Sequence, residues 1–116
     1  MLKEAPATES GGAVREEPVC RCAACGHELA LLRERVDVEG AATRRFVNPG
    51  GIEYQITAFR DAPGCSCVGE RSGYWIWFAG YAWQIALCGR CGQHVGWSFT
   101  GGPAPFFGLI VERIAL

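Results

Sequence analysis

The second half of the chain alternates apolar and polar residues in three successive segments, which predicts strands. Side chains of equal parity lie on one face of a strand, so each segment presents its apolar residues together. Breaks at residues 79–80 and 88–92 would fold the segments back on one another. The apolar sets are Trp75 with Trp77, then Trp83, Ile85 and Leu87, then Val95, Trp97 and Phe99.

A β-hairpin is predicted nearer the N-terminus. Residues 43–47 and 52–59 are strand-like, and the Asn-Pro-Gly-Gly run at 48–51 joins them. Asparagine and glycine tolerate a left-handed backbone and proline holds its φ, so this run is a strong turn signal. The two strands are therefore expected to pair across a four-residue connection.

The remaining segments carry weaker signals. Residues 1–18 are polar and rich in Glu, Ala and Gly, which predicts a disordered tail before a single domain at 19–116. The pattern at 29–38 fits a helix or a strand equally well, 61–73 predicts a loop, and 106–116 predicts a last apolar strand. Sixteen glycines favour turns and strands over helices. The expected fold class is mainly β.

Charge and hydropathy narrow the classes of function. The net charge is −1 and no basic run is present, whereas binding to nucleic-acid phosphates requires clustered Lys and Arg. No apolar run approaches the roughly 20 residues of a membrane span, and the polar N-terminus lacks the apolar core of a signal peptide. The sequence therefore predicts a cytoplasmic protein with neither nucleic-acid nor membrane partners.

Two Cys-x-x-Cys pairs predict a metal site. Cys22 and Cys25 form the first pair and Cys88 and Cys91 the second, each followed by glycine. This spacing lets four thiolates surround one tetrahedral zinc ion, which leaves no position for water and makes the ion structural. Disulfides, disfavoured in a reducing compartment, and free buried thiols are the alternatives. Because 62 residues separate the pairs (88 − 25 − 1), the ion would join distant parts of the chain.

Five further side chains that are able to bind metals lie outside these pairs. Cys65 and Cys67 could bind a second ion, but a single Cys-x-Cys motif is a weak signal. Thiols without a ligand role are the simpler interpretation for them and for Cys20. His27 and His94 follow the two pairs and are expected to be structural histidines that form hydrogen bonds.

The tryptophans predict a second site. Core packing is the usual role of an indole, but Trp77, Trp83 and Trp97 come from separate segments and have small or polar sequence neighbours. Three such rings can wall an open cage for a compact apolar group, with selectivity from main-chain groups at the rim. A methylated ammonium would bind by cation–π attraction and would gain from a nearby carboxylate. Residues 72–111 contain no Asp or Glu, which favours a neutral ring with hydrogen-bonding edges.

Together these motifs resemble the thalidomide-binding (CULT) domain of the cereblon family. The matching residues are the Trp-Phe-Ala-Gly-Tyr-Ala-Trp run at 77–83, the His-Val-Gly-Trp-Ser-Phe run at 94–99, the Asn-Pro turn at 48–49 and both cysteine pairs. The resemblance covers residues 20–116 and implies a β-tent, in which a structural zinc site of four cysteines pins two antiparallel sheets. The chain lacks the other regions of eukaryotic cereblon, so it resembles a single-domain bacterial homologue.

The resemblance also implies a ligand and its site. The pocket would take cyclic imides, above all the glutarimide of thalidomide, lenalidomide and pomalidomide; C-terminal cyclic imides of proteins and uridine-like rings are further candidates. The main-chain carbonyl of Trp75 and amide of Trp77 would pair with the imide edge. Human cereblon has histidine where this chain has Trp75 and Tyr54, so any side-chain hydrogen bond from the first position is lost or changed. The implied ligand-binding residues are Asn48, Pro49, Tyr54, Trp75, Ile76, Trp77, Trp83, Trp97 and Phe99.

Two other functions fit parts of the sequence. A methionine sulfoxide reductase of the B type shares a tent-like fold and paired zinc cysteines, but it needs a nucleophilic thiolate on a late strand. Residues 106–116 contain no cysteine. A zinc ribbon that binds RNA or protein is the third interpretation. We therefore expect a binding module without catalytic residues rather than an enzyme.

Overall fold

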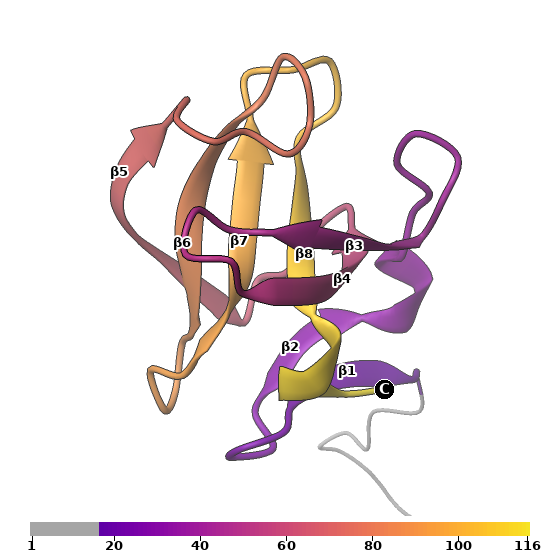
Figure 1. Ribbon diagram of the computed structural model, residues 1–116. Helices are drawn as coiled ribbons and strands as arrows, with labels where there is room; N and C mark the ends of the chain where they lie inside the picture. The colour runs from indigo at the N-terminus through magenta and orange to yellow at the C-terminus, as the bar shows by residue number, and fades with distance from the viewer. Residues whose placement is uncertain (1–16) are drawn as a thin grey trace, which may run out of the picture.

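Residues 17–116 are described by the computed structural model, and the tail predicted at 1–18 lies outside them except for its last two positions. The strands are β1 (Val19–Cys22), β2 (Glu28–Leu31), β3 (Thr43–Val47), β4 (Glu53–Phe59), β5 (Cys65–Ser72), β6 (Ala82–Cys88), β7 (His94–Thr100), β8 (Phe106–Ile110) and β9 (Ile114–Ala115). They form two antiparallel sheets, with the strand orders β2-β1-β9 and β3-β4-β8-β7-β6-β5 (Figure 1). The prediction of a mainly β fold with two antiparallel sheets is confirmed.

Two short 3₁₀-helices occur where the sequence predictions left alternatives open or missed an element. The ambiguous stretch at 29–38 contains the end of β2 followed by η1 (Leu32–Glu34). The strand predicted at 106–116 is broken by η2 (Val111–Arg113), after which β9 joins the other sheet. Among residues 17–116, no helix has the length and apolarity that a membrane crossing requires.

Two predictions in the middle of the chain are wrong. The loop predicted at 61–73 contains β5, an edge strand whose residues are mostly exposed. It has no apolar alternation because neither of its faces is buried. Residues 73–81 form turns rather than the predicted strand, and Trp75 has a left-handed φ of 53°. Trp75 and Trp77 therefore do not share a strand face.

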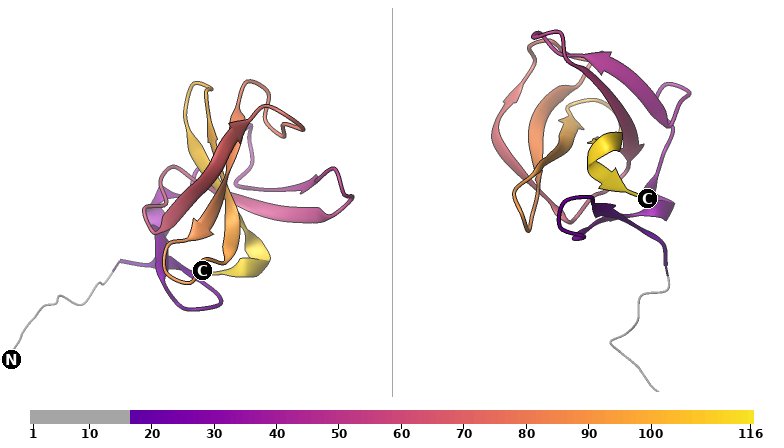
Figure 2. Two further views of the ribbon diagram at one scale, coloured as in Figure 1. Left: turned by 90° about the vertical axis from the view of Figure 1, so that its left-hand side faces the viewer. Right: turned by 60° about the horizontal axis from the view of Figure 1, so that its bottom comes forward.

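The β3–β4 hairpin creates space above the large sheet. β3 pairs with β4 along its whole length, whereas β4 pairs with β8 only from Ile56 to Phe59. The tip of the hairpin thus leaves the sheet and projects from it (Figure 2). Asn48 closes the tip, because its backbone N–H donates to Ile52 O and its side-chain Oδ1 accepts from Ile52 N, both at 2.9 Å.

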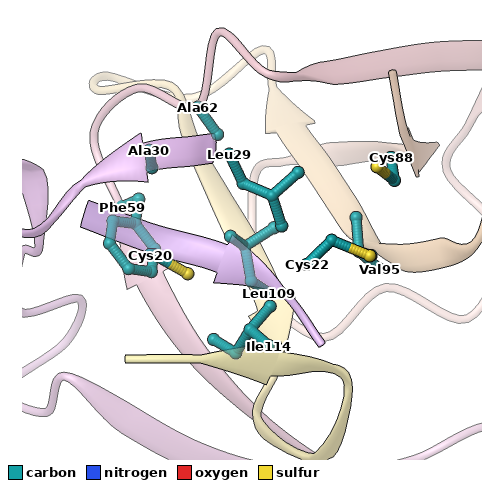
Figure 3. Packing of buried hydrophobic residues seen from close by; sticks show 10 residues of the cluster. All are labelled: Cys20, Cys22, Leu29, Ala30, Phe59, Ala62, Cys88, Val95, Leu109 and Ile114. Atoms are coloured by element: carbon teal, nitrogen blue, oxygen red, sulfur yellow. The ribbon is translucent and has the colours of Figure 1, made fainter. Parts of the chain in front are cut away.

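One apolar cluster fills the space between the two sheets. It brings together side chains of β1 and β2, the ends of β4 and β6, and strands β7 to β9 (Figure 3). Phe59 and Leu29 are its largest members, and Cys20, Cys22 and Cys88 belong to it. Because these thiols sit in an apolar core, the first cysteine of each Cys-x-x-Cys pair is held against the packed sheets.

A second apolar cluster lies between the β3–β4 hairpin and strands β6 to β8 of the same sheet. Its centre is Phe78, which is almost fully buried and meets Phe46, Phe99 and Phe106 edge-on at centroid distances of 4.9–5.0 Å. Phe78 therefore anchors the turn segment at 73–81 to both the hairpin and the sheet. The aromatic rings of the candidate pocket rest on this cluster.

Candidate functional site

Four cysteines from the two sheets converge on one point. The Sγ atoms of Cys22, Cys25, Cys88 and Cys91 lie within 4.8 Å of one another. The shortest separations are 3.7 Å between Cys22 and Cys91 and 3.6 Å between Cys25 and Cys88. A tetrahedron of sulfurs about 2.3 Å from a zinc ion has edges of about 3.8 Å. The cluster therefore fits a tetrahedral metal ion such as zinc.

The two cysteine turns have the same backbone geometry. In the first, Gly26 N donates to Cys22 O at 2.8 Å with a φ of 81°; in the second, Gly92 N donates to Cys88 O at 3.0 Å with a φ of 79°. Glycine has no Cβ and adopts a left-handed φ without steric strain, which explains why it follows each cysteine pair. The turns thus present their thiols as two matching halves of one site.

The second turn also lowers the pKa of its first thiol, that of Cys88. Burial acts to raise the pKa of Cys88, but the backbone N–H groups of Cys91 and Arg90 and the neighbouring thiols outweigh it and lower the pKa to about 7. These N–H groups lie 3.5 Å and 3.4 Å from the Cys88 sulfur. Donors aimed at sulfur favour the thiolate, which is the form that binds metal.

The remaining cysteines lie in different surroundings. Burial raises the pKa of Cys20 and of Cys65 to about 12, so both thiols stay protonated at neutral pH. Cys67 is exposed on β5. Among the described residues, the only group of three or more potential metal ligands is the four-cysteine cluster.

An aromatic pocket lies between the projecting hairpin, the 73–81 turns and strands β6 and β7. Its volume is about 300 Å³, at the lower end of the range typical of small-ligand sites. Eight of the nine predicted ligand-binding residues line it, and the ninth, Ile76, does not. Tyr74, Ile85 and His94 are further lining residues that the sequence analysis did not identify. The eight are Asn48, Pro49, Tyr54, Trp75, Trp77, Trp83, Trp97 and Phe99.

Hydrogen bonds to main-chain carbonyls hold three of the indoles. The Nε1–H groups of Trp75 and Trp77 both donate to Val47 O, at 2.7 and 3.1 Å, and that of Trp83 donates to Tyr74 O at 2.7 Å. The turn segment is thereby tied to the hairpin on one side and to β6 on the other. The N–H donors of these three indoles are therefore paired, whereas among the hydrogen bonds of residues 17–116 none involves the indole N–H of Trp97.

Ring contacts fix the walls further. Trp77 stacks on Phe46 with a centroid distance of 4.9 Å and an interplanar angle of 10°, and it meets Trp97 edge-on at 4.8 Å. Tyr54 and His94 also meet Trp97 edge-on, at 5.1 and 4.8 Å. Trp97 is therefore enclosed by other rings, and only 8% of its surface is exposed.

Known proteins resemble this chain over most of its length. Cereblon of Drosophila persimilis is 37% identical over 117 residues, which cover 91% of this chain, and cereblon of Drosophila melanogaster is 37% identical over 113 residues, which cover 88%. Cereblon of Xenopus tropicalis is 41% identical over 69 residues, 55% of the chain. The chain contains a cereblon-type domain. It spans 15–19% of the length of these relatives, and no family model matches it.

In this cereblon-type domain, one arginine links the pocket to the first cysteine turn. The Arg113 guanidinium donates to His94 O at 3.0 Å and lies 5.8 Å from the centre of the Tyr54 ring. The backbone carbonyl of Arg113 accepts from Ala23 N at 3.0 Å, inside the first Cys-x-x-Cys pair. No local sequence pattern marks Arg113, because its contacts form only when η2 crosses between the sheets.

The surroundings of the His94 imidazole disfavour its charged form. Its Nε2 lies 2.9 Å from Gly96 O, and its Nδ1 lies 3.5 Å from an Arg113 nitrogen. Burial lowers the pKa of His94; the Gly96 carbonyl partly opposes this shift and the Arg113 charge adds to it. The expectation of a structural, hydrogen-bonded histidine agrees with these contacts, and the ring also lines the pocket of the cereblon-type domain.

Proposed function

We propose that this cereblon-type domain is a non-enzymatic binding module whose aromatic pocket takes a cyclic imide. Glutarimide, as in thalidomide, lenalidomide and pomalidomide, is the expected core; C-terminal cyclic imides of proteins and uridine-like rings share its flat donor–acceptor edge. Trp77, Trp83 and Trp97 would form the walls of the cage. Burial of the ring methylenes against indole faces would contribute roughly 25 cal/mol per Å².

The observation that carries the proposal is that Trp75 and Trp77 both line the pocket and that each has a main-chain group without a protein partner in the described part of the chain. Among the hydrogen bonds of residues 17–116, none involves the carbonyl of Trp75 or the N–H of Trp77. Trp75 is half exposed and Trp77 is partly buried, so water can bind both groups, and a ligand that pairs with them would take the place of that water. An imide offers an N–H to the carbonyl of Trp75 and a C=O to the amide of Trp77.

The lining also disfavours a charged guest. None of the eleven lining residues is Asp or Glu, and their polar side-chain groups are those of Asn48, His94, the two tyrosines and the four indole N–H groups, all of them uncharged apart from a protonated imidazole. A methylated ammonium would lose its hydration without gaining a counter-charge. A neutral ring has no such cost, and a closed ring loses less conformational freedom than an open-chain amide.

Zinc is the expected cofactor, as one structural ion on Cys22, Cys25, Cys88 and Cys91. Two Sγ–Sγ separations, 3.6 and 3.7 Å, are close to the edge of a tetrahedral thiolate site, and all four Sγ atoms lie within 4.8 Å of one another. Four protein ligands leave no open position, so the ion would contribute stability rather than chemistry. A cytoplasmic location would keep these thiols reduced and available to the ion.

Two of the three thiols outside the cluster do not favour a reductase. Such an enzyme needs a thiol whose pKa is near neutrality, whereas burial raises the pKa of Cys20 and Cys65 to about 12. The net charge of −1 likewise gives no electrostatic basis for RNA binding.

A titration tests the proposed function. Thalidomide or unsubstituted glutarimide should quench the indole fluorescence and raise the melting temperature by mass action. Trp83→Ala should abolish both responses while the zinc content stays unchanged, and Val68→Ala, which alters an exposed residue outside the pocket, should respond like wild type. A wild-type protein that does not respond at millimolar imide would refute the proposal.

A further inference from the structure

Cys65 lies directly opposite Cys88 in the ladder between β5 and β6. Cys88 is one of the four cysteines of the metal cluster, whereas Cys65 does not belong to it. Side chains of directly opposed residues project from the same face of a sheet, and both of these thiols pack in the apolar cluster between the two sheets. A thiol that is not a ligand therefore lies beside one that is.

No amide of this pair donates across the ladder. The N–H of Cys65 donates to Ala62 O at 3.0 Å, which turns it away from β6. The N–H of Cys88 donates to Gln93 O at 2.7 Å, on the side of β7. In an antiparallel ladder, a pair of this non-hydrogen-bonded kind has Cα atoms about 4.5 Å apart. A disulfide spans Cα separations of about 4.4–6.8 Å, so it can bridge these two residues without moving the strands.

Close backbone packing fixes the register of the pair. One position beyond it, Gly89 N donates to Gly64 O at 2.9 Å. A Cβ at Gly64 would overlap the carbonyl oxygen of Glu28, and one at Gly89 would lie 2.8 Å from Gly64 O. Only glycine fits at either position, and these contacts hold the ends of β5 and β6 together beside the two cysteines.

Other thiols are less suitable partners for Cys65. Cys67 is two positions along the same strand, where Cα atoms are about 6.5 Å apart, near the upper limit for a disulfide. Cys20 belongs to the other sheet. A disulfide within a Cys-x-x-Cys pair would remove two ligands from the cluster at once, whereas a disulfide to Cys65 removes one.

We propose that Cys65 and Cys88 form an oxidative modification site, in which a peroxide joins them as a disulfide and thereby removes one ligand from the metal cluster. Cys65 is partly exposed, so the pair lies within reach of an oxidant the size of water. The inference rests on the proposed zinc site and is independent of imide binding.

The reaction with hydrogen peroxide proceeds in two steps. The Cys88 thiolate attacks one peroxide oxygen, the O–O bond breaks, hydroxide leaves, and a sulfenic acid forms. The Cys65 thiol then attacks the Cys88 sulfur, the S–O bond breaks, and the oxygen leaves with the thiol proton as water. The two sulfurs supply the two electrons that reduce the peroxide. The products are one disulfide, one water and one hydroxide.

Peptide mapping of the zinc-loaded full chain tests the disulfide. Trypsin leaves Cys65 in the peptide 61–71, Cys88 in 72–90 and Cys91 in 91–113. After treatment with hydrogen peroxide and digestion without reductant, mass spectrometry should find 61–71 joined to 72–90. Cys67→Ser should keep this product and Cys65→Ser should lose it. Dithiothreitol should separate the two peptides.

Release of zinc to a chromogenic chelator tests the consequence for the cluster. Cys65→Ser should bind zinc as wild type does, because Cys65 is not a ligand, but should release it about 5- to 10-fold more slowly under peroxide, because it lacks the intramolecular partner. Cys67→Ser, which removes an exposed thiol from the same strand, should release zinc at the wild-type rate. Circular dichroism spectra and melting temperatures before oxidation show that both variants are folded.

Three results would overturn the proposal. They are a main product that joins 72–90 to 91–113, equal rates of zinc release from wild type and Cys65→Ser, and a Cys65→Ser protein that folds without zinc. If wild type itself contains no zinc, the metal assignment fails, and the peptide map still decides whether Cys65 and Cys88 pair. A failed imide titration leaves all of these measurements unaffected.

Discussion

The indole N–H of Trp83 donates to the backbone carbonyl of Tyr74 at 2.7 Å. This hydrogen bond joins β6 to the first turn of the segment that carries Trp75 and Trp77. One pocket wall therefore positions the backbone of the next, and the shape of the pocket depends on a contact that a guest need not touch.

Trp83→Phe should separate these two roles of the indole. Phenylalanine keeps an aromatic face but removes the donor to Tyr74, so the turn loses an anchor worth about 1 kcal/mol. We expect the affinity for glutarimide, measured by calorimetry, to fall about five- to tenfold. Trp83→Ala should cost more, because it also removes the wall. Equal affinities for wild type and Trp83→Phe would show that the hydrogen bond does not organise the site.

Cys25→Ala should leave the protein unfolded or insoluble. Zinc coordination contributes on the order of 10 kcal/mol to small domains, which is comparable to the whole stability of a domain of this size. Metal content by mass spectrometry and thermal melting by circular dichroism measure the two consequences together. Cys67→Ala changes an exposed thiol outside the cluster and should keep both zinc and fold. A folded, zinc-free Cys25→Ala protein would contradict the assignment.

The buried imidazole of His94 should make stability depend on pH. Burial lowers the pKa of His94 in the folded protein, so the unfolded chain takes up the proton first. Stability is then constant above the unfolded pKa of about 6.5 and is lost as the pH falls below it. Urea midpoints of zinc-loaded protein at pH 7.5 and 5.5 should differ less for His94→Gln than for wild type.

His27→Gln is the matched control for this pH effect, since it replaces the histidine after the other cysteine pair. It should show the same change of urea midpoint between the two pH values as wild type. If His94→Gln and wild type lose stability in parallel, the acid sensitivity comes from the metal cluster and not from His94.

Arg113→Met should weaken both the fold and the pocket. The change keeps the aliphatic stem but removes the donor to His94 O and the charge beside the Tyr54 ring. We expect a loss of about 1–2 kcal/mol in the free energy of unfolding and a lower imide affinity. Arg60→Met, at an exposed arginine that pairs with Glu34, should cost less than about 0.5 kcal/mol. Similar values for the two variants would refute the linking role.

The sequence predictions were correct where a short stretch of sequence carries a clear local pattern. Trp83 and Trp97 were predicted to converge because their segments alternate cleanly and form the neighbouring strands β6 and β7, where Ile85 pairs with Trp97. The metal cluster was predicted because two identical motifs, each closed by glycine, encode two identical turns. In both cases a short stretch of sequence determines a short stretch of backbone.

The misassigned segments lack such patterns. Trp75 has the parity of a strand residue, but its backbone is left-handed and its indole N–H donates to Val47 O, 28 residues earlier. β5 shows no alternation because it lies at an edge with both faces largely exposed. His94 and Arg113 meet only after η2 crosses from one sheet toward the other. These features depend on tertiary contacts, which cannot be predicted from the alternation of side chains along a strand or from the secondary-structure propensity of single residues.

The 62 residues between the two cysteine pairs also have a consequence for biosynthesis (88 − 25 − 1). While the ribosome is still making β3 to β5, the emerged polypeptide holds only half of the donor set for its ion. A zinc ion that bound then would have to complete its coordination with other donors, such as water, His27 or thiols of other molecules. A metal ion held by all four cysteines could therefore load only late in translation, and a stalled nascent chain that ends before Cys88 would lack half of the site.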